Sequence, residues 1–371
     1  MKVLFLYLTS FSKTGGIEKF NRAFLKALHE LSIDDVIDAD ALSSHDKDPD
    51  EKYFHKTRFR AFNGNKLLFA FCSVRQAFKY DTFIIGHINL ALVGYLIKKL
   101  KPTAKLILIT HGIEVWMPQT RFKKKLLQSC DTILSVSNYT KDRILFYNPY
   151  IQADKIKIFP NTLDPYFPLP ANFDKPGYLL ERYNLGVDKQ IILTVTRMAY
   201  TEKYKGYDNI IKVLKSIKSK IPSAYYLLGG KSESQEKNRI DVLMEKFGAM
   251  DFLQLLGYIS DKELTDHYLL ADAFVMPSKK EGFGIVFIEA LACGRNVVAG
   301  NKDGSADALM NGELGLLIDP DNEEELEEAI IKSLNRKTTN ESMLEIQKKV
   351  IEQFGFNQYK KRLQQILLND L

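Results

Sequence analysis

The sequence contains few of the residues that build disulfide frameworks, metal sites or membrane spans. Its 371 residues include three widely separated cysteines and six histidines without a ligand-like spacing. These absences exclude a disulfide framework and argue against a structural metal site. No apolar run reaches the roughly 18 residues of a membrane-spanning helix, and the first residues turn polar too soon for a signal peptide. We therefore expect a cytoplasmic protein in a reducing compartment.

Positive charge is in slight excess. The chain has 52 lysines and arginines and 46 acidic residues, a net charge of +6, which is too small and too diffuse to predict nucleic-acid binding. The densest basic stretch is 121–125, and Lys98, Lys99 and Lys101 precede it in the sequence. This stretch could contact anionic lipid at the inner face of a membrane. We favour the simpler interpretation, which is a solvated basic surface.

Predicted strands and helices alternate along most of the chain. They include a strand at 105–110, a helix around 138–147, and a helix to Ala271 that a capping box of Ser260 and Glu263 would open. This alternation indicates parallel α/β sheets of the doubly wound kind. A segment rich in proline and turn residues, 160–176, interrupts it once. We therefore expect two domains, 1–170 and 171–354. An amphipathic segment near the C-terminus, about 355–371, is followed by no strand, and we expect it to form a helix that packs back on the first domain.

Loops that follow the predicted strands should carry the functional residues, because ligands of such sheets bind beyond the carboxyl ends of the strands. Gly15 and Gly16 follow the strand predicted at 2–8, and the helix that starts there could offer backbone N–H groups to an anion or a sugar oxygen. A plain tight turn is the simpler explanation. His111 ends an apolar strand, and its position alone does not separate a functional histidine from a structural one.

Two cations lie in one strand-to-helix loop of the second predicted domain. Arg197 ends a strand, and Lys205 precedes the next helix. Together with the positive end of that helix they could clamp a diphosphate. In the alternative, Arg197 pairs with a carboxylate of its own domain and Lys205 is solvated. The spacing alone slightly favours this alternative.

Two glutamates lie in a predicted strand–loop–helix unit whose helix Gly294 can close. Glu281 lies in the loop, where Gly282 and Gly284 would let a ligand approach the backbone. Glu289 lies inside the apolar helix, and a buried carboxylate needs a polar partner there. That partner is either an arginine elsewhere in the chain or the hydroxyls of a ligand. Paired carboxylates also suit hydrolytic acid–base chemistry, but nothing in this spacing shows that the two carboxylates face the same bond of a substrate.

Taken together, these motifs resemble the retaining glycosyltransferases of family 4. The most specific match is the E-x7-E motif of that family, Glu281-Gly-Phe-Gly followed by Glu289. Three further features match. Arg197 with Lys205 matches the family's phosphate-binding pair, Gly15-Gly16 matches its N-terminal glycine loop, and His111 matches its mid-domain histidine. The resemblance implies the GT-B fold, in which two Rossmann-like, doubly wound α/β domains face each other across a cleft.

Carried over position by position, the resemblance implies a role for each residue. Arg197 and Lys205 would neutralise the diphosphate of the donor as it leaves. Glu281 would hold hydroxyls of the transferred sugar, Glu289 would accept from the ribose hydroxyls, and His111 would lie beside the sugar. Cations and a helix end can stabilise a leaving diphosphate without a metal, so neither a metal nor another cofactor is implied. The implied catalytic residues are Glu281, His111, Arg197 and Lys205. The implied substrate-binding residues are Gly16, Arg197, Lys205, Glu281, Gly282, Phe283, Gly284 and Glu289.

The implied activity is the transfer of a hexose, with retention, from a UDP- or GDP-linked sugar. The acceptor would be a glycan or a lipid-linked intermediate in the synthesis of a surface polysaccharide or glycoconjugate. A nucleotide-sugar epimerase or hydrolase of the same fold is one alternative. A non-catalytic nucleotide-sugar-binding subunit is another, and the presence of both cations and both glutamates argues against it.

Overall fold

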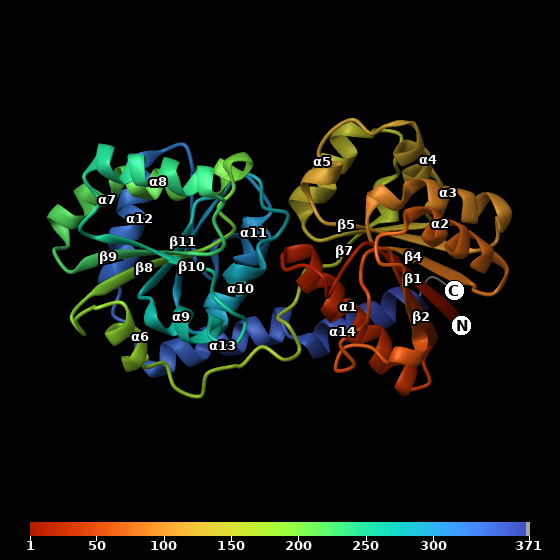
Figure 1. Cartoon of the computed structure of the whole chain (residues 1–371), viewed down its shortest axis with the longest axis horizontal. Coiled ribbons are helices and arrows are strands. Elements are labelled where there is room, and N and C mark those ends of the chain that lie inside the picture. Colours follow the sequence, from red (N-terminus) through yellow and green to blue (C-terminus); the bar gives the residue numbers. More distant parts are fainter. Residues whose placement is uncertain (369–371) are drawn as a thin grey trace. The chain divides into compact units, whose positions relative to one another are not determined.

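The computed structural model describes residues 1–368, and the chain divides into two compact units (Figure 1). Unit 1 contains residues 1–166 together with the chain from Phe354 onward, and unit 2 contains Phe167–Gln353. The sequence predicted boundaries after residues 170 and 354, which differ from these by a few residues. Residues 369–371 of the predicted C-terminal helix lie outside the described residues.

Unit 1 is built on a parallel sheet of seven strands in the order β3-β2-β1-β4-β5-β6-β7. The strands are β1 (Lys2–Tyr7), β2 (Asp38–Ser43), β3 (Phe59–Ala61), β4 (Thr82–Ile85), β5 (Lys105–Thr110), β6 (Thr132–Ser135) and β7 (Ile156–Ile158). The α-helices are α1 (Gly16–Ile33), α2 (Lys66–Arg75), α3 (Ala91–Leu100), α4 (Arg121–Ser129), α5 (Asn138–Tyr147) and α14 (Phe356–Leu368). The 3₁₀ helices are η1 (Lys56–Arg58), η2 (Gln76–Phe78), η3 (Ile88–Leu90), η4 (Ile113–Val115) and η5 (Ala153–Lys155).

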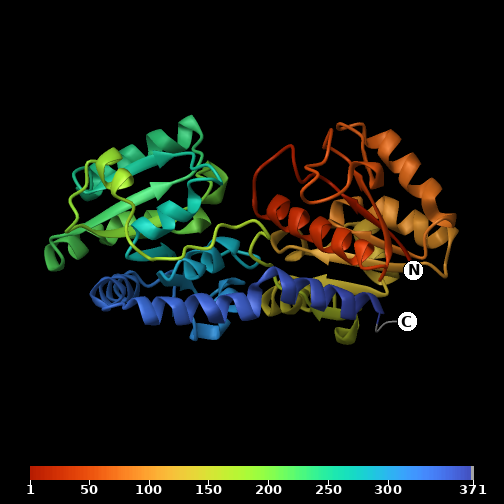
Figure 2. The same ribbon diagram turned by 90° about the horizontal axis from the view of Figure 1, so that it is seen from below.

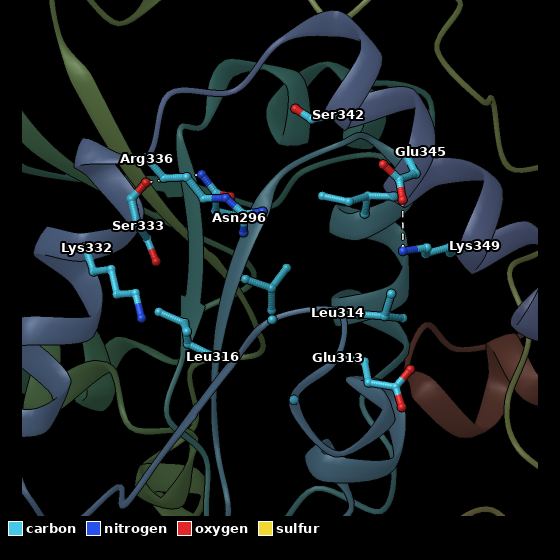
Figure 3. A pocket seen from close by; sticks show the side chains of 14 residues that line it. Asn296, Glu313, Leu314, Leu316, Lys332, Ser333, Arg336, Ser342, Glu345 and Lys349 are labelled. Atoms are coloured by element: carbon cyan, nitrogen blue, oxygen red, sulfur yellow. Dashed lines mark hydrogen bonds and ion pairs between the residues drawn. The ribbon is translucent and has the colours of Figure 1, made fainter.

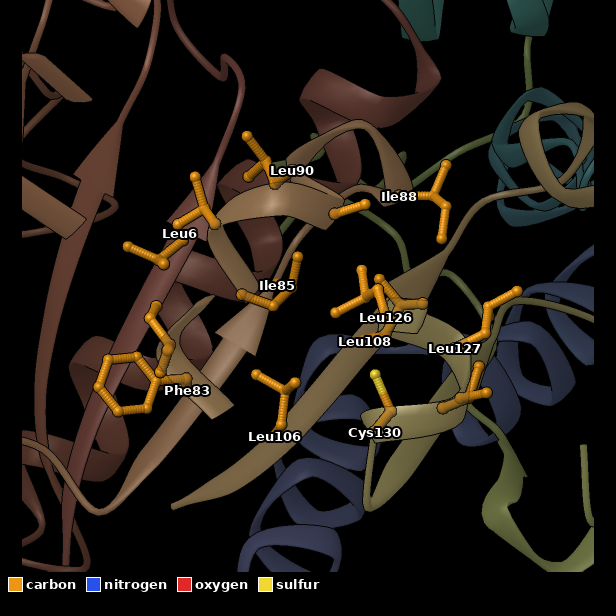
Figure 4. Close-up of a cluster of buried hydrophobic side chains, with 14 of the residues drawn as sticks. Leu6, Phe83, Ile85, Ile88, Leu90, Leu106, Leu108, Leu126, Leu127 and Cys130 are labelled. Atoms are coloured by element: carbon orange, nitrogen blue, oxygen red, sulfur yellow. The ribbon is translucent and has the colours of Figure 1, made fainter. Parts of the chain in front are cut away.

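Helices cover the two faces of this sheet in two groups. α2, α3 and α4 lie side by side over one face (Figure 1). Figure 4 shows the apolar core beneath them, in which Leu106 and Leu108 of β5 belong to one cluster with Leu126 of α4. α1 and α14 pack on the other face (Figure 2), where the rings of Phe20 and Tyr359 meet edge-on with centroids 6.1 Å apart. The C-terminal helix therefore packs on the first unit, as predicted.

Unit 2 is built on a parallel sheet of six strands in the order β10-β9-β8-β11-β12-β13. The strands are β8 (Gln190–Val195), β9 (Ala224–Gly229), β10 (Leu253–Gly257), β11 (Ala273–Met276), β12 (Asn296–Gly300) and β13 (Leu316–Ile318). The α-helices are α6 (Gly177–Arg182), α7 (Tyr207–Lys220), α8 (Ser234–Phe247), α9 (Leu264–Leu270), α10 (Ile285–Ala292), α11 (Ser305–Ala308), α12 (Glu323–Asn335) and α13 (Asn340–Phe354). The 3₁₀ helices are η6 (Tyr200–Lys205) and η7 (Met310–Gly312). Across residues 1–368, none of the helices is both long enough and apolar enough to cross a membrane.

The strand order reverses once in each sheet. The reversal lies between β1 and β4 in unit 1 and between β8 and β11 in unit 2. Loops at the carboxyl ends of such strand pairs run in opposite directions and leave a crevice, which is where open α/β sheets bind their ligands. The fold is thus two Rossmann-like, doubly wound units, as the sequence predicted. Each unit carries one such crevice-forming edge.

Candidate functional site

The loops at the strand-order reversals hold most of the residues that the sequence analysis singled out. In unit 2, Arg197 and Lys205 follow β8, and Glu281 follows β11. In unit 1, Gly16 follows β1, and His111 follows β5, which pairs with β4. The predicted residues therefore lie at the carboxyl edges of both sheets.

Lys205 and Glu281 form an ion pair in unit 2, although 76 positions of the sequence separate them. Lys205 ends η6, and Gly206 after it has φ +83°, in the left-handed region. A Cβ at Gly206 would overlap the carbonyl oxygen of Pro277. Only glycine therefore lets this loop approach the loop after β11, and that approach brings Lys205 to Glu281.

The Lys205–Glu281 pair is largely buried, with each side chain 16% exposed. Burial by itself lowers the pKa of Lys205, but the Glu281 carboxylate outweighs this effect, and the pKa is raised overall. Lys205 is therefore charged at neutral pH, in a place where partial desolvation strengthens its attraction for anions. A solvated Lys205, the alternative left open by the sequence, is wrong.

Arg197 belongs to the same loop but is far more exposed. Its guanidinium pairs with Glu202 of η6, and its side chain is 67% exposed. The hydrogen bond to Glu202 raises the pKa of Arg197. Arg197 thus pairs with a carboxylate of its own unit, as the alternative held. Glu202 is only 12% exposed, but the guanidinium itself faces solvent, where a diphosphate could reach it.

Asp303, which the sequence analysis missed, holds the backbone of the Glu281 loop. Its carboxylate accepts hydrogen bonds from the Ser278 hydroxyl at 2.7 Å and from the backbone N–H groups of Glu281 at 2.7 Å and Ser305 at 2.9 Å. Burial raises the pKa of Asp303 to about 6. A single acidic residue after β12 belongs to no motif that we could read, and only its buried contacts reveal its role.

The Glu281 loop is packed tightly against the loop after β12. A Cβ at Gly304 would overlap the carbonyl oxygen of Gly282, and Gly284 has φ +88° directly before α10. Phe283 is buried as a whole residue, so its ring does not face a ligand. These constraints hold the Gly282–Gly284 backbone at the N-terminus of α10, where N–H groups suit anionic or hydroxyl oxygens.

Glu289 is buried on α10, and one of its polar partners is Tyr268 of α9. The Tyr268 hydroxyl donates to Glu289 Oε2 at 2.8 Å. Burial first, and then the charge of Glu289, raise the pKa of Tyr268 well above its ordinary value. The sequence analysis considered an arginine or ligand hydroxyls as the partner and missed this tyrosine. A carboxylate has room for several donors, so the predicted contact with ribose stays a prediction.

His111 in unit 1 is held by three neighbours. Its Nε2 lies 2.8 Å from the carbonyl oxygen of Gly86, so Nε2 carries the proton and donates. Its ring meets Phe20 edge-on at 4.9 Å between centroids and stacks on His87 at 6.0 Å. Burial lowers the pKa of His87 to about 4. These contacts fix the ring of His111 and leave Nδ1 for another partner.

Gly16 begins α1 in an open position. A Cβ on Gly16 would meet no atom within 4 Å, in contrast to Gly206, so packing in unit 1 does not require glycine there. Its position at a helix N-terminus would let a ligand oxygen reach the backbone. The structure leaves this role as a prediction.

The loop that leads from β1 to Gly16 is folded around Asp46, a residue that the sequence analysis also missed. Asp46 Oδ1 accepts from the backbone N–H groups of Phe11 at 3.0 Å and Ser12 at 2.9 Å, and Oδ2 accepts from the N–H of Ser10 at 2.9 Å. The Ser43 hydroxyl adds a bond of 2.7 Å. Burial acts to raise the pKa of Asp46, but these hydrogen bonds hold it below its ordinary value.

A cavity elsewhere in unit 2 is not part of this site. It has a volume of about 210 Å³ and is lined by Asn296 and Leu316, at the amino ends of β12 and β13, together with Lys332, Arg336 and Glu345 (Figure 3). That edge of the sheet is opposite the Glu281 loop. Within residues 1–368, no group of three or more His, Cys, Asp or Glu side chains is arranged to hold a metal ion.

Comparison with protein families gives one match in each unit. The family model described as Glycosyltransferase Family 4 matches residues 14–167, and the model described as Glycosyl transferases group 1 matches residues 180–350. Gly16 and His111 fall within the first match, and Lys205, Glu281 and Glu289 within the second. The chain belongs to the family-four glycosyltransferases.

Two curated relatives of this family-four protein show what similar chains do. The GDP-mannose-dependent alpha-(1-6)-phosphatidylinositol monomannoside mannosyltransferase of Mycobacterium tuberculosis is 28% identical over 249 residues, which are 64% of this chain and 62% of that protein. The mannosylfructose-phosphate synthase of Agrobacterium fabrum is 26% identical over 54% of this chain and 44% of its own length. The chain therefore matches about three fifths or less of the length of these relatives.

A solved structure places the family-four chain in the GT-B fold class. The crystal structure of Anabaena HepE in complex with UDP covers all of both chains with a TM-score of 0.80 and 18% identity. At this identity the likeness shows the fold alone. The GT-B class implied by the sequence is confirmed.

Proposed function

We propose that this family-four protein transfers a hexose from a UDP- or GDP-linked sugar to a glycan or lipid-linked acceptor, with retention and without a metal. The observation that carries the proposal is the Lys205–Glu281 pair. The pair sets a cation beside a carboxylate at the strand-order reversal of unit 2, where open α/β sheets bind ligands. Lys205 would bind the diphosphate of the donor, and Glu281 would accept hydrogen bonds from the sugar hydroxyls.

Departure of the nucleoside diphosphate develops negative charge on the leaving group. Lys205 is partly desolvated, and the side chain of Arg197 is 67% exposed and open to a ligand. Both cations would stabilise that charge more in the transition state than in the ground state. Once Lys205 turns to the diphosphate, Glu281 is released to accept hydrogen bonds from the transferred sugar. We assign no carboxylate as a nucleophile, so we favour attack of the acceptor on the face that the diphosphate leaves.

The other predicted residues of unit 2 would bind the rest of the donor. The backbone N–H groups of Gly282, Phe283 and Gly284 would donate to sugar oxygens at the N-terminus of α10. Glu289 would accept from the ribose hydroxyls in addition to the bond that it accepts from Tyr268. In unit 1, Gly16 would offer its backbone and His111 its ring to the substrates.

A lipid-linked acceptor and a place at the inner face of a membrane belong to the same proposal. The mycobacterial relative is named for a phosphatidylinositol monomannoside acceptor and a GDP-mannose donor, whereas the HepE structure holds UDP. The proposal therefore includes both guanine and uracil as the base of the nucleotide donor. Synthesis of a surface polysaccharide or glycoconjugate, and a cytoplasmic location, remain predictions of the sequence.

Nucleotide binding tests the donor site. GDP, UDP or their sugars should raise the melting temperature, because a ligand of the folded state stabilises it by about 2.7 kcal/mol at one hundred times its Kd. Lys205→Ala should remove that shift and abolish turnover. Lys203→Ala is the matched control, because Lys203 is exposed on the same η6 and should behave as the wild type.

Removal of one partner alone leaves the other charge buried and unpaired, so folding needs a separate check. The double variant Lys205→Ala/Glu281→Ala should keep the far-UV circular dichroism of the wild type and still fail to turn over. Near-normal turnover in this double variant would refute the site assignment.

The two alternative functions predict different products. Release of free sugar or of an epimer without any acceptor would favour a hydrolase or epimerase. Saturable nucleotide-sugar binding without turnover across a broad panel of acceptors would favour a binding subunit. Transfer to an acceptor that depends on Lys205 would exclude both.

A further inference from the structure

The outer surface of α2 carries large apolar side chains that no part of residues 1–368 covers. Leu67, Phe71 and Phe78 are 86%, 62% and 73% exposed, and Leu68 beside them is exposed as well. Leu67 and Phe71 are four residues apart and share one stripe of the helix, which Phe78 of η2 continues. Single exposed apolar residues are ordinary on protein surfaces, but a cluster of them marks a binding surface.

The layer formed by α2, α3 and α4 is also strongly basic. Residues 66–130 contain eleven lysines and arginines and two acidic residues, an excess of nine, whereas the whole chain has an excess of six. α2, α3 and α4 themselves contain no acidic residue. The two acids lie outside these three helices, where Asp81 binds the N–H of Lys2 and Glu114 of η4 binds the N–H of His111. The positive charge of the protein is therefore concentrated on this layer.

Several of these cations have no anionic partner. Lys98 and Lys101 pair with Asp131 and Asp81. By contrast, six other cations of the layer form no ion pair with any residue of the described part of the chain: Lys66, Arg75, Lys79, Arg121, Lys123 and Lys124. Aromatic rings lie among the cations, since the ammonium of Lys125 lies 4.8 Å from the ring centroid of Tyr95 and 6.0 Å from that of Phe122.

We propose that the outer face of α2, α3 and α4 binds the surface of an anionic lipid bilayer. Leucine and phenylalanine side chains enter the interfacial region of a bilayer, and lysines and arginines meet the headgroup phosphates. The solvated basic surface that the stretch 121–125 suggested by itself does not explain Phe71 and Phe78. Protein interfaces tend to exclude charge from their centres, whereas cations and apolar rings are interleaved here.

This lipid-binding face adjoins the ligand-binding edge of unit 1. α2 follows β3 and α4 follows β5, so Leu67 and Phe122, in the first turns of these helices, lie towards the carboxyl edge of the sheet. Gly16 and His111 lie at the same edge. The face would let unit 1 take a lipid-linked acceptor from the membrane, a consequence that rests on the proposed function. The binding of lipid itself does not depend on that function.

Sedimentation of the full chain with vesicles tests the face. We expect binding to vesicles of equal parts phosphatidylglycerol and phosphatidylcholine, and much weaker binding to phosphatidylcholine alone or at high salt. Arg121→Ala/Lys124→Ala should lower the partition coefficient about 25-fold, because each cation near an anionic surface contributes about fivefold. Phe71→Ser/Phe78→Ser should lower it as well, and should remove the residual binding to phosphatidylcholine.

Matched controls separate this face from general surface effects. Phe146→Ser alters an exposed phenylalanine of α5 in the same unit, and Lys237→Ala/Lys246→Ala removes two exposed cations of α8 in unit 2. Both should bind vesicles as the wild type does. All variants should keep the same melting temperature and the same shift with nucleotide, which shows that they are folded.

Two results would overturn the proposal. The first is the absence of wild-type binding to anionic vesicles, or equal binding by every variant. The second is a dimer that Phe71→Ser/Phe78→Ser dissociates in analytical ultracentrifugation, because a second copy of the chain would then cover the stripe. Vesicle binding without any nucleotide-induced shift would instead refute the donor assignment and leave the lipid-binding face intact.

Discussion

Asp303 couples the protonation of a single buried carboxylate to the geometry of the Glu281 loop. Its pKa of about 6 lies above the value near 3.9 of an unfolded chain. The folded protein therefore binds this proton more tightly, and the free energy of unfolding should fall as the pH rises from about 4 to about 6 and then level off. Activity should instead rise with pH over this range, because a protonated Asp303 no longer accepts from all three of its donors and the deprotonated form does.

Asp303→Asn tests this coupling. The amide offers one acceptor oxygen and points an NH₂ group at a backbone donor, so the Glu281 loop loses its anchor. We expect kcat/KM to fall at pH 7.5 and its acid limb near pH 6 to disappear, while the wild type keeps that limb. The pH profile of kcat/KM is the measurement. An unchanged limb in the variant would assign the titration to another group.

Tyr268 tests what the buried Glu289 does. Tyr268→Phe removes the hydroxyl that donates to Glu289 and should lower the free energy of unfolding by about 1–3 kcal/mol, since a buried carboxylate loses a donor. If Glu289 also binds ribose, the KM for the donor should change in addition. Urea unfolding and donor titration separate the two roles. Tyr183→Phe, which removes a bond to His267, is the control for the loss of a tyrosine hydroxyl in the same unit.

At the scale of elements, loops around buried carboxylates position the helices that carry the site. Asp46 accepts from three N–H groups of the loop before α1, and Asp303 accepts from the Ser278 hydroxyl and the Glu281 N–H of the loop before α10. In both places the N-cap residue of the helix that follows is a glycine, and the helix has no side-chain cap. The carboxylate that orders the chain comes from a neighbouring strand's loop instead of from the helix itself.

Asp46→Ala should therefore disorder the loop that leads to Gly16. We expect the free energy of unfolding to fall by about 3 kcal/mol at pH 7, because the buried N–H of Ser10 and the partly buried N–H groups of Phe11 and Ser12 lose their acceptor. The folded-state pKa of Asp46 is depressed, so its stabilisation is present above about pH 4 and is lost as the pH falls further. Urea unfolding should show a larger difference between wild type and variant at pH 7 than at pH 3. Asp50→Ala, at an exposed neighbour, should cost little at either pH.

At the scale of the whole molecule, the two units have separate apolar cores. A nucleotide should therefore protect the unit that binds it more than the other. We expect hydrogen exchange to slow on addition of GDP or UDP in the loops after β8, β11 and β12 of unit 2. The amides of β5 and β6 in unit 1 are the internal control, and equal protection there would contradict a donor site in unit 2.

Elements whose pattern is local were predicted well. The strand at 105–110 and the helix at 138–147 have the predicted bounds, and Gly294 follows α10 with φ +69° as a C′ residue should. The capping box read from Ser260 and Glu263 is wrong, because α9 begins at Leu264 without a side-chain cap. β2 and α13 were not predicted at all, since β2 is half polar and α13 has no strand after it to mark an α/β unit.

The sequence by itself determined the fold class and the family, because strand–helix periodicity and the E-x7-E motif are carried by residues close together in the chain. It could not show that Lys205 meets Glu281, that Asp303 and Asp46 hold the two loops, or that the stripe of α2 stays exposed. Those facts depend on which distant segments become neighbours at the carboxyl edges of the sheets, and on which helices cover which face. Buried hydrogen bonds and exposed area are properties of that packing, so only the tertiary structure decided them.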